Sequence, residues 1–237
     1  MVTQSIEMEA QKSRVVNALG SLGIQQISKS GSRPDEIQIT DVVTHIPVLN
    51  KFVLVVLSIK QAVTREMGSF AFMHDLNKGC VVFVLVNDKY VVTTKQHRIP
   101  FGKFLEDIPR GWIEDSKSEP AIQVVNRKVP SLLSISKVMS ITPLLKNTKV
   151  DDSMRDGLID LVMVKVQTHV DYSKEELQAA LRMTKSAEGI TPIVRDLQEV
   201  FDQVDKICDE TNDQDWLDDY HSTFCVTLAE KRIKVSK

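Results

Sequence analysis

The sequence predicts an α+β domain built around a mixed β-sheet. Two runs rich in Val, Leu and Phe, at 52–59 and 80–86, have the length and composition of strands. A short helical segment and more strand-type runs follow them, and longer helical patterns gather towards the C-terminus. Strands, one short helix, strands again and then terminal helices do not make a regular βα alternation, which favours a mixed sheet.

The first 45 residues are expected to form an N-terminal extension of this domain. Apolar residues at 6, 15, 16, 19 and 22 predict a short helix over 4–22, which Gly20 and Gly23 would end. The stretch "SKSGSRPDE" is typical of a loop. The stretch "IQITDVVTHIPV" alternates weakly and predicts a strand.

The centre of the chain, residues 46–206, is expected to form the main domain. The short connection "NDK" at 87–89 predicts a hairpin, so that strands 80–86 and 90–95 become antiparallel neighbours. Ser118 is expected to cap a helix that has Pro120 in its first turn, and Pro130 limits that helix to a few turns. "SISKVMSITPLL" predicts a strand, "KNTKVDDSMRDG" a polar loop, and "LIDLVMVKVQTHV" a further strand.

The C-terminal part of the chain is expected to be helical, with 207–237 as an extension. Ser173 and Glu176 have the spacing of a capping box. Apolar residues at 193, 194, 197, 200, 201, 204 and 207 predict an amphipathic helix in "TPIVRDLQEVFDQVDKIC", and another helix is expected within 213–233. Residues 171–219 hold 14 Asp and Glu against 5 Lys and Arg, a pattern that favours a solvated helical face over a dedicated binding tail.

Composition excludes several classes of function. The formal net charge of -2 and the 5% of aromatic residues argue against a nucleic-acid partner. The apolar runs are too short to span a bilayer, so we expect no membrane partner and a cytoplasmic location. Cys80, Cys208 and Cys225 lie far apart in the sequence and have no spacing typical of zinc ligands, which fits a reducing compartment.

The stretch "YVVTTKQHRIPFGKFLEDIPRGWIE" resembles the Nudix family, in particular its ADP-ribose pyrophosphatase branch. Residues 96–98 match a Gln-aromatic-Arg step in which His97 replaces the aromatic residue. Residues 107–111 match the turn that opens the family's signature box, and Glu114 matches an acidic residue just inside it. The resemblance implies an α/β/α sandwich around the mixed sheet, a nucleotide-like small molecule as ligand, and a homodimer.

The sequence departs from the family where the chemistry is carried out. Counted from Gly111, Lys117 stands where the box has its first Glu, and Arg127 and Lys128 occupy the segment where more carboxylates are expected. The segment 120–150 contains no Asp or Glu. Mg²⁺ prefers carboxylate and water oxygens, and a like charge about 4 Å away costs roughly 4 kcal/mol at an effective dielectric constant of about 20. We therefore expect no metal cofactor and no ordinary Nudix hydrolysis at this helix.

Three interpretations stay open. In the first, a degenerate Nudix-like domain binds a nucleoside diphosphate or an ADP-ribose-like ligand with little or no hydrolysis, through cationic and aromatic side chains: Arg98, Arg110, Trp112, Lys117, Arg127 and Lys128. In the second, the protein is an active hydrolase that holds Mg²⁺ through relocated carboxylates: Glu114, Asp151, Asp152 and Asp156. In the third, the protein is an interaction scaffold whose acidic C-terminal helices form the partner surface.

Overall fold

The computed structural model describes residues 17, 20, 38–48, 52–60, 66–98, 103–114, 117–151, 155–183, 189–208 and 220–235. Apart from positions 17 and 20, the helix expected over 4–22 lies outside the described residues, as does the loop expected before residue 37. The chain divides into two units, one comprising residues 1–77 and 149–157 and the other comprising residues 78–148 and 158–237. The three-part division expected from the sequence stays a prediction.

In the first unit, three strands form an antiparallel sheet: β1 (Gln38–Val48), β2 (Phe52–Lys60) and β3 (Met67–Asp75). Val53, Val55 and Leu57 alternate along β2 and lie on one face, where they form a small core with Phe72 of β3. The strands expected around 38–48 and over 52–59 are confirmed.

The second unit contains a mixed sheet, in which parallel β9 and β4 are followed by antiparallel β5 and β10. The shorter β6 pairs with β5, β7 pairs with β4, and β8 pairs with β9. Their bounds are β4 (Gly79–Val86), β5 (Tyr90–Arg98), β6 (Lys103–Asp107), β7 (Arg110–Trp112), β8 (Ser136–Asp151), β9 (Arg155–Thr168) and β10 (Thr191–Asp196). The residues of β8 and β9 that fall within 149–157 are counted with the first unit. The mixed sheet predicted from the sequence is confirmed.

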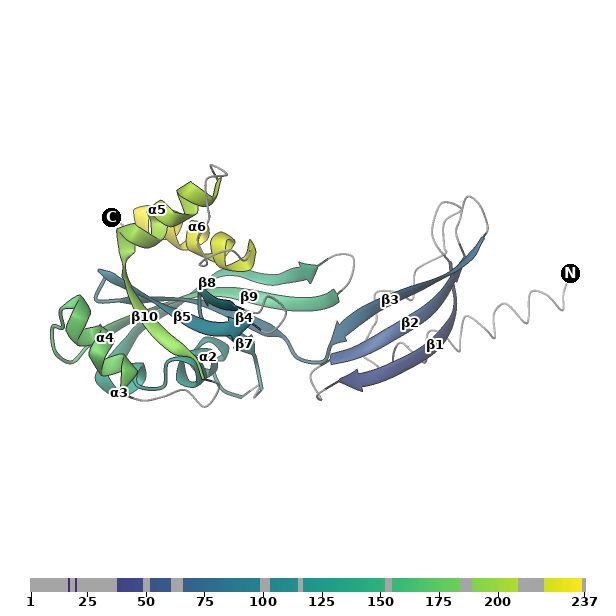
Figure 1. The fold of residues 1–237 in the computed structure, drawn as a ribbon, viewed down its shortest axis with the longest axis horizontal. Coiled ribbons are helices and arrows are strands. Elements are labelled where there is room, and N and C mark those ends of the chain that lie inside the picture. Colours follow the sequence, from purple (N-terminus) through teal and green to yellow (C-terminus); the bar gives the residue numbers. More distant parts are fainter. Residues whose placement is uncertain are drawn as a thin grey trace, which may run out of the picture. The chain divides into compact units, whose positions relative to one another are not determined.

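Helices cover both faces of this sheet (Figure 1). One face packs against α2 (Pro120–Lys128), α3 (Leu132–Ile135) and α4 (Lys174–Arg182), and the other against α5 (Leu197–Cys208) and α6 (Tyr220–Val235). Strand β4 separates the two cores, because Val82 and Val84 point towards α2 whereas Val81 and Phe83 point towards α5 and α6. The expected α/β/α sandwich is therefore present, and a strand buried on both faces explains the continuous apolar run at 80–86.

Two local signals in the sequence define the ends of elements. Asn87 and Asp88 both have φ of 53°, as a tight hairpin turn requires, and they connect β4 to β5. The capping box at the start of α4 is complete: Ser173 Oγ accepts a hydrogen bond from the backbone N–H of Glu176, and the Glu176 carboxylate accepts one from the N–H of Ser173. These bonds to Ser173 hold the pKa of Glu176 below its ordinary value.

Three expectations about elements are corrected. The helix after the Gly111 turn begins at Pro120, but its N-cap is Glu119 rather than Ser118, and no side chain caps it. The segment 146–157, expected as a loop, continues β8 to Asp151 and begins β9 at Arg155. The helix expected over 191–208 begins only at Leu197, because residues 191–196 pair with β5 as β10.

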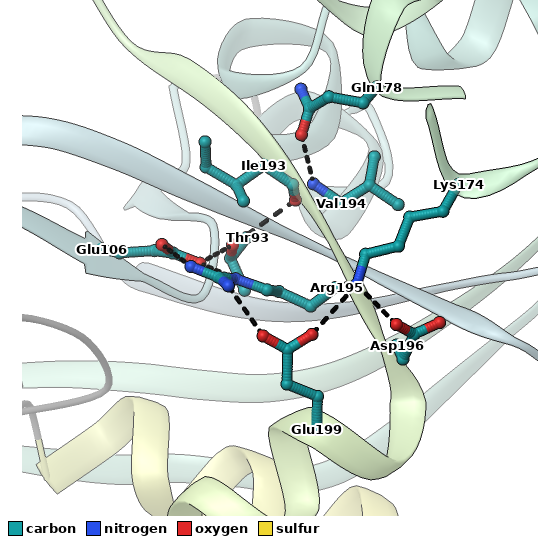
Figure 2. Close-up of polar contacts among 9 residues, drawn as sticks. All are labelled: Thr93, Glu106, Lys174, Gln178, Ile193, Val194, Arg195, Asp196 and Glu199. Carbon is teal, nitrogen blue, oxygen red and sulfur yellow. Dashed lines mark hydrogen bonds and ion pairs between the residues drawn. The ribbon is translucent and has the colours of Figure 1, made fainter. Parts of the chain in front are cut away.

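The outer edge of β10 is covered by one side chain. The Gln178 amide of α4 donates to the carbonyl of Pro192 (2.9 Å) and accepts from the N–H of Val194 (2.8 Å), as a neighbouring strand would do. Figure 2 shows the bond to Val194. In the described part of the chain, no helix is both long and apolar enough to cross a membrane.

Candidate functional site

The turn Asp107–Gly111 lies where β4 and β5 separate. The two strands pair with each other only near their hairpin, from Val84 opposite Val92 to Val86 opposite Tyr90. Further from the hairpin, β6 takes the place of β4 beside β5, and β7 takes the place of β5 beside β4. The turn thus enters the sheet at the point where the two strands part.

Hydrogen bonds to backbone carbonyls hold the turn on both sides. The N–H of Val82 donates to the carbonyl of Pro109 (2.8 Å), and the Thr94 hydroxyl donates to the carbonyl of Asp107 (3.3 Å). The Asp107 carboxylate is buried and forms an ion pair with the Arg110 guanidinium (3.0 Å). The sequence motif therefore marks a fixed turn at the centre of the sheet.

One face of α2 binds the segment that follows the turn. The Gln123 amide accepts from the N–H of Glu114 (3.1 Å) and donates to the carbonyl of Ser118 (3.0 Å). One helical turn later, the Arg127 guanidinium donates to the carbonyl of Trp112 (2.8 Å) and to the carboxylate of Glu114 (2.7 Å). Since residues four apart share a helix face, both side chains hold the same segment.

Gly111 is required by this arrangement. A Cβ atom added there would lie 2.1 Å from Arg127 Nη2. The glycine lets the guanidinium pass close to the backbone and reach the Trp112 carbonyl. The glycine of the Pro-Arg-Gly step thus has a steric reason on the α2 side of the sheet.

We expect the Gly111→Ala variant to lose about 1–3 kcal/mol of unfolding free energy, because the new methyl group displaces a guanidinium that has two partners. In an Arg127→Ala background the same change should cost clearly less, which urea denaturation of the four proteins in this cycle measures. Gly68→Ala is the control, since its Cβ would meet only Ile59 at 3.7 Å. An equal cost of Gly111→Ala in both backgrounds would refute the steric explanation.

The residues predicted to bind the ligand lie on both faces of the sheet. Arg110 and Trp112 pair with Val81 and Gly79, and cross-strand partners share a face, so both side chains lie on the face that α5 and α6 cover in part. Arg127 belongs to α2 on the opposite face and binds the Glu114 segment. The structure thus groups Arg110 with Trp112 and sets Arg127 apart from them.

The other predicted cations differ in exposure. Lys128 is buried, with 8% of its surface exposed, whereas Lys117 is exposed. Arg98 ends β5, and its side chain lies outside the described part of the chain. Among the predicted ligand contacts, Arg110 and Trp112 are therefore the two that lie together on one face of the sheet, and both are half-buried.

Of the relocated carboxylates, Glu114 is the one whose side chain the structure describes, and it is bound to Arg127. The side chains of Asp151, Asp152 and Asp156 lie outside the described residues. A carboxylate that the sequence analysis did not single out, Asp160 of β9, forms an ion pair with Lys78 (2.7 Å). Its position opposite Cys80 in the parallel pair β4–β9 becomes apparent only from the strand register.

The donor set on α2 does not fit a divalent cation. The last turn of the helix carries Arg127 and Lys128, and the sequence from 120 to 150 offers no carboxylate. Among the residues that the structure describes, no group of three or more His, Cys, Asp or Glu is placed to hold a metal ion. Ammonium and guanidinium groups repel Mg²⁺ and offer it no lone pair, so we derive no metal-dependent step here.

The two described thiols, those of Cys80 and Cys225, are buried. Burial in the sheet raises the pKa of Cys80 to about 12, with nearby Asp160 adding to the effect, and burial alone raises that of Cys225 to about 12. Both residues lie in the apolar cores and are free of disulfides. Cys80 is thus a small core residue between the sheet and α2.

Comparison with solved structures decides the fold. The crystal structure of an ADP compounds hydrolase superposes with a TM-score of 0.60 and 11% sequence identity, over 84% of this chain and 95% of that chain. The chain has a Nudix-like fold.

A second solved structure, the Nudix hydrolase RenU from M. smegmatis, is 10% identical over 68% of this chain and 86% of that chain, with a TM-score of 0.35 that is too low to carry an argument. No family model matches the chain, and a search of curated proteins finds no match. At these identities the likeness concerns the fold, and the function of this Nudix-like chain has to be argued from its own residues.

Proposed function

We propose that this Nudix-like protein binds a nucleoside diphosphate or an ADP-ribose-like ligand and hydrolyses it little or not at all. The observation that carries the proposal is the chemistry of α2, where cations stand in the last turn and Arg127 binds the described carboxylate Glu114. Without carboxylates on this helix, a metal ion that would activate water against a diphosphate has no ligands there. The ligand class is suggested by the likeness in fold to an ADP compounds hydrolase.

Arg110 and Trp112 are the residues that we assign to the ligand. Arg110 keeps 30% of its side chain exposed, and a guanidinium carries five N–H donors, enough to bind Asp107 and a phosphate together. Trp112 lies two residues further on the same face of β7 and offers an indole for stacking. Lys117 and Arg98 stay predicted contacts, and self-association and a cytoplasmic location belong to the same proposal.

The test is a calorimetric titration of the purified protein with ADP-ribose, with and without Mg²⁺ or Mn²⁺, while AMP release is followed by chromatography. We expect binding that does not need metal and no sustained release of AMP. Arg110→Ala should weaken binding about tenfold or more, the factor for one lost charge-assisted hydrogen bond. Lys165→Gln, which removes an ion pair with Asp88 on the β4–β5 hairpin, is the control and should bind normally.

Metal-dependent turnover that Glu114→Ala abolishes would instead establish the active hydrolase with relocated carboxylates. Absence of both binding and turnover with ADP-ribose and with simple nucleoside diphosphates would refute the proposal and leave the scaffold interpretation. Binding by calorimetry and AMP release by chromatography, measured on the same samples, thus distinguish the three interpretations.

A further inference from the structure

A chain of ion pairs connects the strand before the turn to the C-terminal part of the domain (Figure 2). It begins at Glu106 of β6, whose side chain is only 6% exposed. The Glu106 carboxylate accepts hydrogen bonds from Arg195 Nε (2.9 Å) and Nη2 (2.7 Å) of β10, and from the Thr93 hydroxyl (2.5 Å) of β5. A bidentate guanidinium thus holds a buried carboxylate in one orientation.

The series of ion pairs continues from Arg195 to helices α5 and α4. Arg195 Nη1 donates to Glu199 of α5 (2.7 Å), and Lys174 of α4 donates to Glu199 (3.1 Å) and to Asp196 (2.5 Å). Burial acts to raise the pKa of Glu199, but its bonds to Lys174 and Arg195 outweigh burial and lower it. Burial likewise acts to lower the pKa of Lys174, and its two carboxylate partners raise it overall. These bonds favour the charged forms of both Glu199 and Lys174.

Glu106 connects this series of ion pairs to the turn, because it lies next to the turn in the sequence. Glu106 immediately precedes Asp107, the last residue of β6, and only Ile108 and Pro109 separate β6 from β7. Rotation or withdrawal of the Glu106 side chain would move the first residue of the turn. Arg110 and Trp112 follow within six residues, so their positions depend on where the turn begins.

We propose that Arg195 is a positioning residue that acts through Glu106 to fix the turn and thereby the ligand contacts of Arg110 and Trp112. The inference rests on the proposed function for its effect on the ligand, but its effect on the turn stands independently. The two parallel N–H···O bonds of the guanidinium constrain the orientation of the Glu106 carboxylate as well as its position.

The experiment uses Trp112 as a reporter in the full-length chain. The sequence holds two tryptophans, so a Trp216→Phe parent leaves Trp112 as the source of indole fluorescence. In this parent, Arg195→Gln should change the emission maximum of Trp112 and its quenching by acrylamide under native conditions, where far-ultraviolet circular dichroism shows the variant folded. Arg195→Lys, which keeps the charge but not the two-pronged geometry, should give an intermediate change.

Ligand affinity is the second measurement on the same proteins. Arg195→Gln should bind ADP-ribose about tenfold more weakly than the parent, the factor for one lost charge-assisted bond to the ligand. Lys165→Gln removes a cation about as exposed as Arg195, but one whose partner Asp88 is exposed on the β4–β5 hairpin, and it should change neither the emission nor the affinity. Where Arg195→Gln does not fold, Glu106→Gln retains the shape of the acceptor and takes its place.

The outcomes separate the two proposals. A folded Arg195→Gln or Glu106→Gln protein whose Trp112 emission and quenching equal those of the parent overturns the positioning role. A parent that does not bind ADP-ribose refutes the proposed function, while the Trp112 signal still decides whether Arg195 positions the turn. A changed emission with unchanged affinity overturns the link to the ligand.

Discussion

Replacing Arg195 by Leu is expected to lower the free energy of unfolding by about 3 kcal/mol, because the buried Glu106 carboxylate then keeps a threonine hydroxyl but loses its charged partner. We place the effect at the lower end for a broken buried ion pair, since 28% of the Arg195 side chain is exposed. Urea denaturation followed by circular dichroism measures this loss.

A double variant gives this prediction a control. In Glu106→Leu/Arg195→Leu both charges are gone, so no unpaired carboxylate is buried and the protein should recover much of the stability that the single variant loses. Strictly additive losses from Glu106→Leu and Arg195→Leu would show that the two side chains contribute independently, contrary to the bidentate geometry in the structure.

Replacing Phe83 by Ala is expected to cost about 3–5 kcal/mol, since the side chain is completely buried between the sheet and helices α5 and α6. Its ring stacks against that of Phe201 with centroids 6.4 Å apart and planes 12° from parallel. Truncation removes this contact and leaves a cavity that the rigid strand cannot close.

Phe104→Ala is the matched control for Phe83→Ala. Phe104 lies on β6 with 55% of its surface exposed and contacts His97 edge to face. Its loss should change stability by less than about 1 kcal/mol, as is usual for surface positions. Similar losses for the two variants in thermal or urea unfolding would contradict the assignment of Phe83 to the core.

Several parts of the fold are determined by signals that lie close together in the sequence. The apolar run at 80–86, the Asn87–Asp88 turn and the capping box at Ser173 each predict the element that the structure contains. Pro130 likewise limits α2, which ends at Lys128. These signals succeed because the interactions behind them act within a few residues.

Other elements depend on partners that local patterns do not reveal. Residues 191–196 share their apolar pattern with the helix that follows, yet β5 offers them a ladder of backbone bonds and they become a strand. The polar residues at the end of β8 and the start of β9 suggest a loop, although strand structure extends through them. In both cases tertiary pairing overrides the local preference.

At the candidate site, too, some features can be predicted from the sequence and others depend on tertiary contacts. The motif at 107–111 locates the turn, but the sequence gives no sign that Gln123 and Arg127 hold the segment after it. The bond between Arg195 and Glu106 joins residues 89 positions apart, and only the pairing of β5 with both β6 and β10 brings them together. A search for charged residues of opposite sign would have found too many equivalent pairs to choose this one.

The side-chain amide of Gln178 also affects whether another copy of this protein can pair with the edge of the sheet. A terminal strand with open donors and acceptors is a template on which another chain can extend the sheet, and such growth leads to aggregation. Here the Gln178 amide occupies the carbonyl of Pro192 and the N–H of Val194, so these two backbone groups of the edge strand β10 already have a partner. Another copy that added a strand to this part of β10 would first have to displace Gln178.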